Sequence, residues 1–158
     1  MNEPKEAIAV ATEADADALT TVKPNCPGTD VVERFRSLRE DVDGTWLLLK
    51  LDDTVIGWCV AVWSGKKTHP EYPDMEDLFV RPEHRNRGHG ARLISEVERM
   101  AKARGHDKLG VAVNPDDNAS ARRLYERLGY RHDGGTKYLD GVYDGYEDWV
   151  IDLEKQLF

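Results

Sequence analysis

Two glycines and two arginines lie just before the most regular helical pattern of the chain. The segment is Arg85-Asn86-Arg87-Gly88-His89-Gly90-Ala91, and it follows an apolar stretch that ends at Val80. The first turn of a helix presents unpaired N–H groups and the positive end of the helix dipole, and glycine lets an anion approach that backbone closely. The segment therefore predicts an anion-binding loop suited to a pyrophosphate.

Two common nucleotide-binding motifs do not fit this loop. Gly88-His89-Gly90 is not followed by the Gly-Lys-Ser/Thr of a nucleoside triphosphate loop. The dinucleotide fingerprint needs a third glycine or alanine, and Leu93 occupies that position. The alternative for a lone Gly-x-Gly before a helix is a strand-to-helix turn without a ligand.

Asn118 and Tyr125 are a second pair of residues with chemical potential. Asn118 precedes a helical pattern, where asparagine is a good N-cap, and that role alone accounts for it. Tyr125 lies beside Leu124 at the edge of the apolar face of this helix, so a core aromatic is its alternative role. A tyrosine hydroxyl can also protonate a departing thiolate.

Three carboxylates lie close together in the stretch that ends at Val80, namely Asp74, Glu76 and Asp77. Strand alternation places Asp74 and Glu76 on one face and Asp77 on the other. Such carboxylates can bind an ammonium group or take its proton, directly or through a water. The alternative for Glu76 is a solvated acid at the end of a strand.

The patterns around these residues predict strands and helices that alternate in the second half of the chain, which calls for an α/β arrangement with helices covering a sheet. We expect strands at 8–10, 46–51, 55–63, 75–80 and 109–113, and a final strand or hairpin at 143–153. We expect helices at 14–22 after the N-cap Thr12, at 31–42, across 93–101 with a stop at Gly105, and at 121–128 with a stop at Gly129. Loops are expected at 23–29 and 64–74.

Composition narrows the classes of partner. The 158 residues suit one domain, and the net charge of −8 argues against a nucleic-acid partner while it suits a cationic substrate or simple solubility. Neither an apolar run of membrane-spanning length nor a signal-peptide pattern is visible, so we expect no membrane contact and a cytoplasmic location. Cys26 and Cys59 have neither metal nor redox spacing.

The histidines show no ligand spacing with a cysteine or a carboxylate, so no metal is expected. Two of them, His89 and His106, are expected to face solvent. The five are His69, His84, His89, His106 and His132.

Arg85-x-x-Gly88-x-Gly90 resembles the Arg/Gln-x-x-Gly-x-Gly/Ala signature of the GNAT N-acetyltransferase superfamily. The stretch from Asn118 to Tyr130 is similar to the second motif of that superfamily, and the combined likeness covers roughly Met75 to Tyr130. It implies a single domain over 1–158 with a cofactor-binding core at about 75–130. It also implies the GNAT fold: an α/β (α+β) architecture whose mixed, mostly antiparallel sheet is splayed in the middle and has helices on both faces.

The resemblance implies acetyl-CoA as cosubstrate and assigns residues by position. Tyr125 would be the catalytic acid, Glu76 the base or ammonium ligand, and Asp74 with Glu76 the substrate-binding pair. A backbone N–H near Phe79 or Val80 would stabilise the carbonyl oxygen. The implied cofactor contacts are Leu78, Phe79, Val80, Arg85, Asn86, Arg87, Gly88, His89, Gly90, Ala91, Asn118 and Tyr125.

The sequence identifies the acceptor less clearly than the cosubstrate. The stretch Glu76–Val80 is similar to the equivalent strand of diamine acetyltransferases, which implies a small-molecule amine such as a polyamine, an aminoglycoside or another xenobiotic amine, attacked directly in a ternary complex. A protein or peptide acetyltransferase is an alternative, although Ala112 or Val113 stands where N-terminal acetyltransferases carry a glutamate. A non-catalytic acyl-CoA-binding module is another, and Tyr125 together with Glu76 argues against it.

The surroundings of the acceptor site are predicted only in outline. The first helices and the loop 64–74 would form the acceptor pocket, flanked by Trp58, Trp63 and Tyr72, whose rings can bind a cation. Core packing is the favoured role of both tryptophans. The resemblance also implies a possible homodimer through the stretch 138–149.

Overall fold

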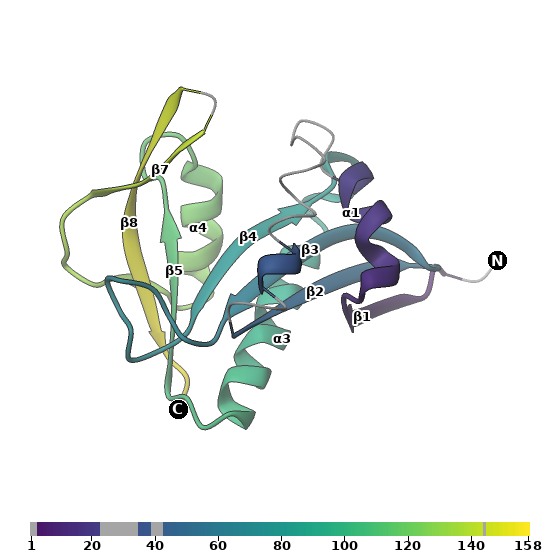
Figure 1. Ribbon diagram of the computed structural model, residues 1–158, viewed down its shortest axis with the longest axis horizontal. Helices are drawn as coiled ribbons and strands as arrows, with labels where there is room; N and C mark the ends of the chain where they lie inside the picture. The colour runs from purple at the N-terminus through teal and green to yellow at the C-terminus, as the bar shows by residue number, and fades with distance from the viewer. Residues whose placement is uncertain (1–2, 23–34, 39–42, 144) are drawn as a thin grey trace.

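The computed structural model describes residues 3–22, 35–38, 43–143 and 145–158, which form one open sheet with helices on both faces (Figure 1). The strand order is β1-β2-β3-β4-β5-β8-β6, and β7 pairs with β8. The strands are β1 (Glu6–Val10), β2 (Gly44–Leu51), β3 (Thr54–Val62), β4 (Asp74–Val80), β5 (Lys108–Val113), β6 (Arg131–His132), β7 (Tyr138–Tyr143) and β8 (Tyr146–Gln156). The helices are α1 (Ala16–Val22), α3 (His89–Ala103) and α4 (Ala119–Arg127), with 3-10 turns η1 (Glu13–Asp15) and η2 (Pro82–His84).

The predicted mixed, mostly antiparallel sheet is confirmed. Within the described residues β4 and β5 are the parallel pair, and the remaining strand pairs run antiparallel. The predicted hairpin at 46–63 is β2–β3. Asp52 and Asp53 both have positive φ, 47° and 70°, which matches a tight hairpin turn whose backbone twist follows the strands.

Two apolar layers cover the two faces of the sheet. The amphipathic helix α3 buries Leu93, Ile94, Val97 and Ala101 against one face, and α4 packs on the same side. The residues of α1 and the helical residues 35–38 cover the other face. There Phe35, Trp46, Trp58 and Phe79 follow one another as edge-on or tilted ring pairs, with centroids 5.3 to 5.9 Å apart. Trp58 and Trp63 are both buried, which confirms their predicted packing role.

The ends of the helices follow the predicted local signals with one difference. Gly105 and Gly129 follow α3 and α4 with φ of 89° and 102°, the left-handed conformation that glycine adopts without strain. The first helix was expected from residue 14, but the chain first makes the 3-10 turn η1 and becomes α-helical at Ala16. The Asp15 carboxylate accepts the Thr12 N–H at 2.8 Å, so a local hydrogen bond tightens this first turn.

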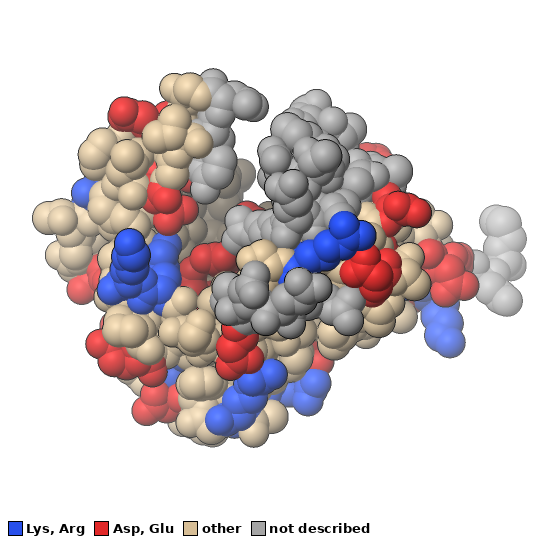
Figure 2. Space-filling model, viewed as in Figure 1, with Lys and Arg blue, Asp and Glu red and all other residues tan. Residues whose placement is uncertain are grey.

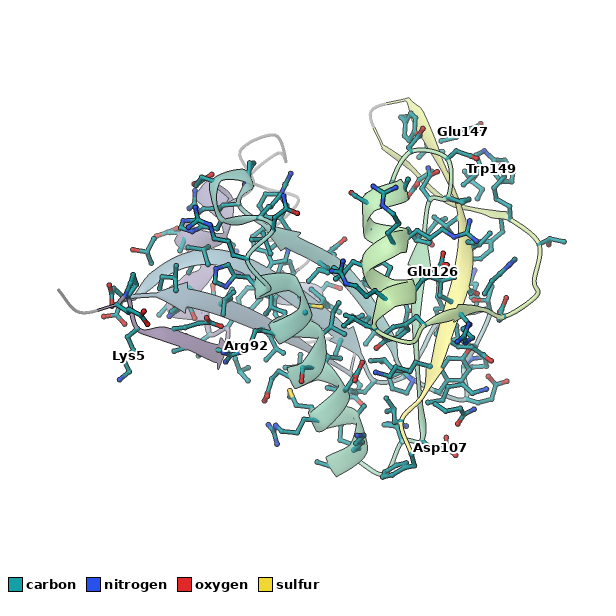
Figure 3. All side chains as sticks on the ribbon, turned by 180° about the vertical axis from the view of Figure 1, so that it is seen from behind. Lys5, Arg92, Asp107, Glu126, Glu147 and Trp149 are labelled. Carbon is teal, nitrogen blue, oxygen red and sulfur yellow. The ribbon has the colours of Figure 1, made fainter. Side chains whose placement is uncertain are left out.

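The C-terminal hairpin is longer than the sequence pattern indicated. It extends over β7 and β8, residues 138–156, where a strand or hairpin at 143–153 was expected. The side chains of Leu139 and Val142 on β7 are exposed, so this edge strand lacks the apolar alternation that marks a half-buried strand. Figure 3 shows Glu147 and Trp149 on the same hairpin.

Some predictions fall outside the described residues. The loop at 23–29 lies there entirely, and of the helix expected at 31–42 residues 35–38 are described and helical. The described residues contain no helix long and apolar enough to cross a membrane.

Candidate active site

The sheet opens between β4 and β5. These strands pair only at Asp74 with Gly110 and at Met75 with Val111, and beyond these pairs β4 runs away from β5 (Figure 1). The register of β4 against β3 shifts between the pairs Trp58–Phe79 and Val60–Glu76, and Asp77 there has φ of 51°. Such a bulge bends and twists a strand. The predicted splay in the middle of the sheet is thereby confirmed, with its cause in β4.

The anion-binding loop leads from β4 through η2 into α3. Asn86 and Gly88 both have positive φ, 61° and 86°, and no side chain caps α3 at Gly88. The Arg92 N–H donates to the Gly88 carbonyl at 3.0 Å as the first helical hydrogen bond. The N–H groups before Arg92 therefore have no intrahelical partner, and they lie at the positive end of a fifteen-residue helix.

The basic side chains of this region have different partners. Arg85 donates through Nε to the Val80 carbonyl at 2.8 Å, and its guanidinium lies 5.5 Å from the Phe79 ring centroid, which fixes a positive charge at the end of β4. Arg87 is exposed. Arg92 reaches Glu6 of β1 at 3.2 Å, beside β1 in Figure 3. Arg85 and Arg87 thus add positive charge at this loop, where an anion would bind.

His89 and His106 were both expected to face solvent, and the structure buries each of them in part. His89 is only 10% exposed at its side chain, with Nδ1 3.7 Å from a Glu6 carboxylate oxygen. His106 is half-buried and stacks parallel to Trp63, with ring centroids 6.4 Å apart. Tertiary packing therefore covers most of the His89 side chain and part of His106.

The two glycines of the loop occupy positions with different steric requirements. A Cβ on Gly88 would meet open space, so its left-handed backbone is what requires glycine there. A Cβ on Gly90 would lie 3.4 Å from Leu124 of α4 and 3.8 Å from Leu78, an ordinary van der Waals contact. Gly90 thus marks where α3, α4 and β4 come together beside the opening.

Helix α4 carries the other two predicted residues. Asn118 caps it through a hydrogen bond from the Ala121 N–H to its Oδ1 at 3.4 Å, so the predicted N-cap is confirmed. Tyr125 is only 6% exposed, and its ring packs edge-on against Tyr130 with centroids 6.2 Å apart. Among the described residues its hydroxyl has no hydrogen-bond partner, which leaves it available to a ligand.

The three carboxylates of β4 lie at the mouth of the opening in different environments. Asp74 and Glu76 stand opposite Val62 and Val60, two residues of the α1-side layer, so the expected common face is confirmed. Asp74 is fully buried, Glu76 is half-buried and Asp77 is exposed at the bulge. Acidic side chains are visible at the hollow that Figure 2 shows in the upper middle of the molecule.

Electrostatic coupling links these acids to Tyr125. Burial, foremost, raises the pKa of the Tyr125 hydroxyl above its usual range, and the negative charges of Asp74 and Asp77 add to this effect. The same two acids raise the pKa of the Cys59 thiol, which burial already raises strongly. Both Tyr125 and Cys59 therefore stay protonated at neutral pH.

Sequence reasoning missed one residue beside this site. The sequence assigns His69 no metal-ligand spacing and no role, but its Nε2 lies 3.1 Å from Asp74 Oδ1, and both side chains are buried. The five-residue spacing across a loop with Pro70 and Pro73 matches neither helix nor strand, so no periodic signal marks it. Within the described ranges, no three His, Cys, Asp or Glu side chains are grouped as a metal site.

The chain resembles known proteins both in sequence and in structure. The model of the acetyltransferase (GNAT) family matches residues 11–130. A Salmonella typhimurium protein solved with its cofactor acetyl-CoA is similar in structure, with a TM-score of 0.72 and 18% identity over 97% of this chain and 94% of that one.

Two further similar structures are of enzymes with different acceptors. The ribosomal-protein-S18-alanine N-acetyltransferase of Escherichia coli has a TM-score of 0.75 and 16% identity over 97% of this chain and 94% of that one. A spermidine N-acetyltransferase chimera from Vibrio cholerae and hSSAT has a TM-score of 0.74 and 15% identity over 96% and 95%. One fold thus serves both peptide and polyamine acceptors, and it does not decide between them.

Proposed function

The chain belongs to the GNAT acetyltransferase family and acts with acetyl-CoA, and we propose that its acceptor is the primary amine of a small molecule such as a polyamine, an aminoglycoside or another xenobiotic amine. The observation that carries this proposal is the cluster of carboxylates on β4, where Asp74, Glu76 and Asp77 stand on one strand and the charges of Asp74 and Asp77 act on Tyr125. A negative cleft concentrates cations and orients them. Most primary amines are cations at neutral pH, so such a site suits them.

The residues on the other side of the opening fit acetyl-CoA. The start of α3 offers backbone N–H groups, and Arg85 and Arg87 offer positive charge, for the pyrophosphate. The edge of β4 at Leu78–Val80 lacks a β5 partner and can pair with an extended amide-containing arm. We assign the pyrophosphate to Arg85 through Ala91, and the arm to Leu78–Val80 and Asn118. When bound, acetyl-CoA supplies an acetyl thioester as the electrophile.

We assign to Tyr125 the stabilisation of the departing sulfur. Because burial raises its pKa, this hydroxyl is a weak acid that keeps its proton at neutral pH. It therefore donates a hydrogen bond to developing negative charge and gives up its proton only as that charge forms. Its buried ring, held against Tyr130, keeps the hydroxyl in one position.

We assign to Glu76 the binding and deprotonation of the acceptor. Glu76 is half-buried on the face it shares with Asp74. Its carboxylate binds the ammonium and accepts a proton directly or through a water, because only the neutral amine attacks. A backbone N–H near Phe79 or Val80 would stabilise the carbonyl oxygen.

Cys59 favours direct attack over a covalent acyl-enzyme. Its thiol is buried, and burial holds its pKa far above the neutral range, so the nucleophilic thiolate does not form. The other cysteine, Cys26, lies outside the described residues. We therefore propose that the amine attacks the thioester directly in a ternary complex.

The test is a thiol-release assay with acetyl-CoA and a panel of polyamines, aminoglycosides, amino acids and short peptides. Turnover with a small polyamine or aminoglycoside and none with peptides supports the proposal. Turnover only with peptides would identify a peptide acetyltransferase. If no acceptor reacts while acetyl-CoA still raises the melting temperature, a non-catalytic acyl-CoA-binding module is favoured.

We also propose a homodimer that pairs through the β7–β8 hairpin. Its exposed apolar side chains are Leu139, Val142, Tyr146 and Trp149, with Val142 58% exposed. Exposed apolar side chains gathered on one hairpin mark an association surface. Light scattering after size exclusion tests this: a dimer that Val142→Asp converts to a monomer supports it, and a monomeric parent chain contradicts it.

A further inference from the structure

The loop between β3 and β4 places an aromatic pair on the β5 part of the sheet. His69 and Tyr72 stack in parallel, with ring centroids 4.2 Å apart. A Cβ on Gly110 of β5 would lie 2.9 Å from atoms of both rings. Gly110 lies between Leu109 and Val111, which face the α3 and α4 layer, so the stack occupies the opposite face. The stack therefore lies beside the first of the two β4–β5 pairs, Asp74 with Gly110.

Both ring nitrogens of His69 face oxygen atoms. Nδ1 lies 3.1 Å from the Tyr72 carbonyl oxygen, and Nε2 lies 3.1 Å from Asp74 Oδ1. A carbonyl oxygen only accepts hydrogen bonds, so Nδ1 carries a hydrogen. Nε2 carries a second one if Asp74 is ionised, or accepts one if Asp74 is protonated. In both cases the pair holds one proton more than a neutral imidazole beside a carboxylate.

The charges around His69 favour the imidazolium form. Burial lowers the pKa of His69, but the hydrogen bond and the charge of Asp74 outweigh it, and the pKa is raised overall. Asp152 of β8 acts in the same direction. Two cations lie close to this set. Lys66 pairs with Asp140 at 3.1 Å and also feels the charge of Asp74. Lys108 lies 5.1 Å from the centroid of the Tyr72 ring and pairs with Glu154 at 3.4 Å. Tyr72 itself donates its hydroxyl to Glu154 of β8 at 3.1 Å.

The second oxygen of Asp74 is left without a protein partner. Oδ2 is buried and has no hydrogen bond from the residues that the structure describes. A buried carboxylate oxygen is costly unless something donates to it. Asp74 still pairs with β5, one residue before the last pair of these strands, and its charge acts on Tyr125. The oxygen that lacks a donor thus belongs to the carboxylate between His69 and the opening.

We infer that His69 is a positioning residue of the acetyl transfer: it holds Asp74 ionised and in place, so that Asp74 receives the ammonium of the acceptor. This inference rests on the proposed function, and it explains why a histidine is buried under the acceptor side of the site. The imidazolium balances the charge of Asp74 and uses one carboxylate oxygen, and the other remains for a hydrogen bond from the amine. Loss of the His69 proton at higher pH removes the donor and loosens Asp74.

Three variants separate this role from packing. His69→Phe keeps a ring for the stack on Tyr72 and removes both hydrogen bonds. His69→Gln keeps an uncharged donor for Asp74. Tyr72→Phe is the matched control, because it keeps the stack and removes only the hydroxyl bond to Glu154. Each variant is compared with the parent chain by melting temperature, acetyl-CoA affinity, and the kinetics of the best acceptor in the amine panel.

We expect His69→Phe to raise the KM of the amine by about tenfold, the loss of one charge-assisted hydrogen bond, with acetyl-CoA affinity unchanged. His69→Gln restores most of this loss near neutral pH. It also lacks the alkaline fall of kcat/KM that the parent shows as pH rises through the raised pKa of His69. If His69→Phe and Tyr72→Phe lower only the melting temperature, His69 merely packs the loop and the inference is wrong.

A measurement without turnover separates this inference from the proposed function. Titration of the His69 imidazole by nitrogen-15 NMR is repeated with spermidine present. A cation bound at Asp74 weakens the pair, so the pKa of His69 falls on addition of spermidine. If the amine panel gives no turnover but this shift occurs, the proposed function fails and the amine-binding pair stands. If neither occurs, both fail, and turnover with an unshifted His69 overturns the inference alone.

Discussion

The two sides of the strand opening are built from different chemical groups. On the α3 side, positive potential comes from backbone N–H groups that glycine and a left-handed Asn86 expose, with arginines added at the edge. On the loop side, negative charge comes from side chains, one of them fully buried against His69. A site made of backbone needs particular backbone angles, whereas a site made of side chains needs only that the fold brings them together. The backbone-built side therefore leaves a recognisable spacing of glycines in the sequence, whereas the side-chain-built side leaves no such pattern.

If the two sides act separately, a variant on one side changes either the affinity for acetyl-CoA or the KM of the amine, but not both. Tyr125 stands between them, so its variant has the largest expected effect. We expect Tyr125→Phe to lower kcat by about 100-fold, the usual size of one acid–base contribution, with acetyl-CoA affinity unchanged. The ring keeps its packing and its hydroxyl has no described partner, so the melting temperature should stay the same.

Tyr130→Phe is the control for this prediction. It removes the buried hydroxyl that donates to Glu98 at 2.9 Å, so it lowers stability and leaves kcat intact. Steady-state kinetics give kcat, and thermal melts give the melting temperature, for both variants. Equal kcat values in the two variants would remove Tyr125 from the chemistry.

Glu76→Gln tests the acceptor side. We expect kcat/KM for the amine to fall by about tenfold or more at neutral pH, because the neutral amide neither attracts an ammonium nor takes its proton. Acetyl-CoA affinity, measured by calorimetry, should not change. Glu83→Gln is the control on the cofactor side, since Glu83 is exposed in η2. A shift in acetyl-CoA affinity with Glu76→Gln would show that the two sides are not separate.

Gly88→Ala tests the backbone that carries the anion site. A side chain at φ of 86° is strained by about 1 to 2 kcal/mol, so we expect acetyl-CoA to bind about tenfold more weakly, with amine KM unchanged. Gly105→Ala is the matched control, because Gly105 has a similar φ of 89° and open space for a Cβ but lies beyond the other end of α3. Equal acetyl-CoA affinities in the two variants would contradict the assignment of Gly88.

Arg85→Ala has the smallest expected effect. Its side chain is exposed and already donates to Val80, so we expect acetyl-CoA affinity to fall by about twofold to fivefold, and less in high salt. Titrations at two ionic strengths measure this. A loss that does not depend on salt would indicate that Arg85 acts by holding the end of β4 and not through its charge.

Local chemistry explains what the sequence predicted well. The β2–β3 hairpin follows from two apolar runs around Asp52-Asp53, α3 from its apolar spacing, and the α4 cap from Asn118. Each depends on residues within one or two turns of the chain, and a pattern can record such dependence. The left-handed backbone before α3 belongs to this group, because its geometry is set by neighbouring residues around Gly88.

The sequence by itself therefore determined the fold class, the family likeness and the position of the glycine-containing turn before α3. Only the tertiary structure decided that β4 bulges at Asp77 and leaves β5, that Asp74 is buried, and that His69 pairs with it over Gly110. The physical reason is that these contacts join separate strands and a loop, and their free energy depends on burial and electrostatic fields that the whole fold creates.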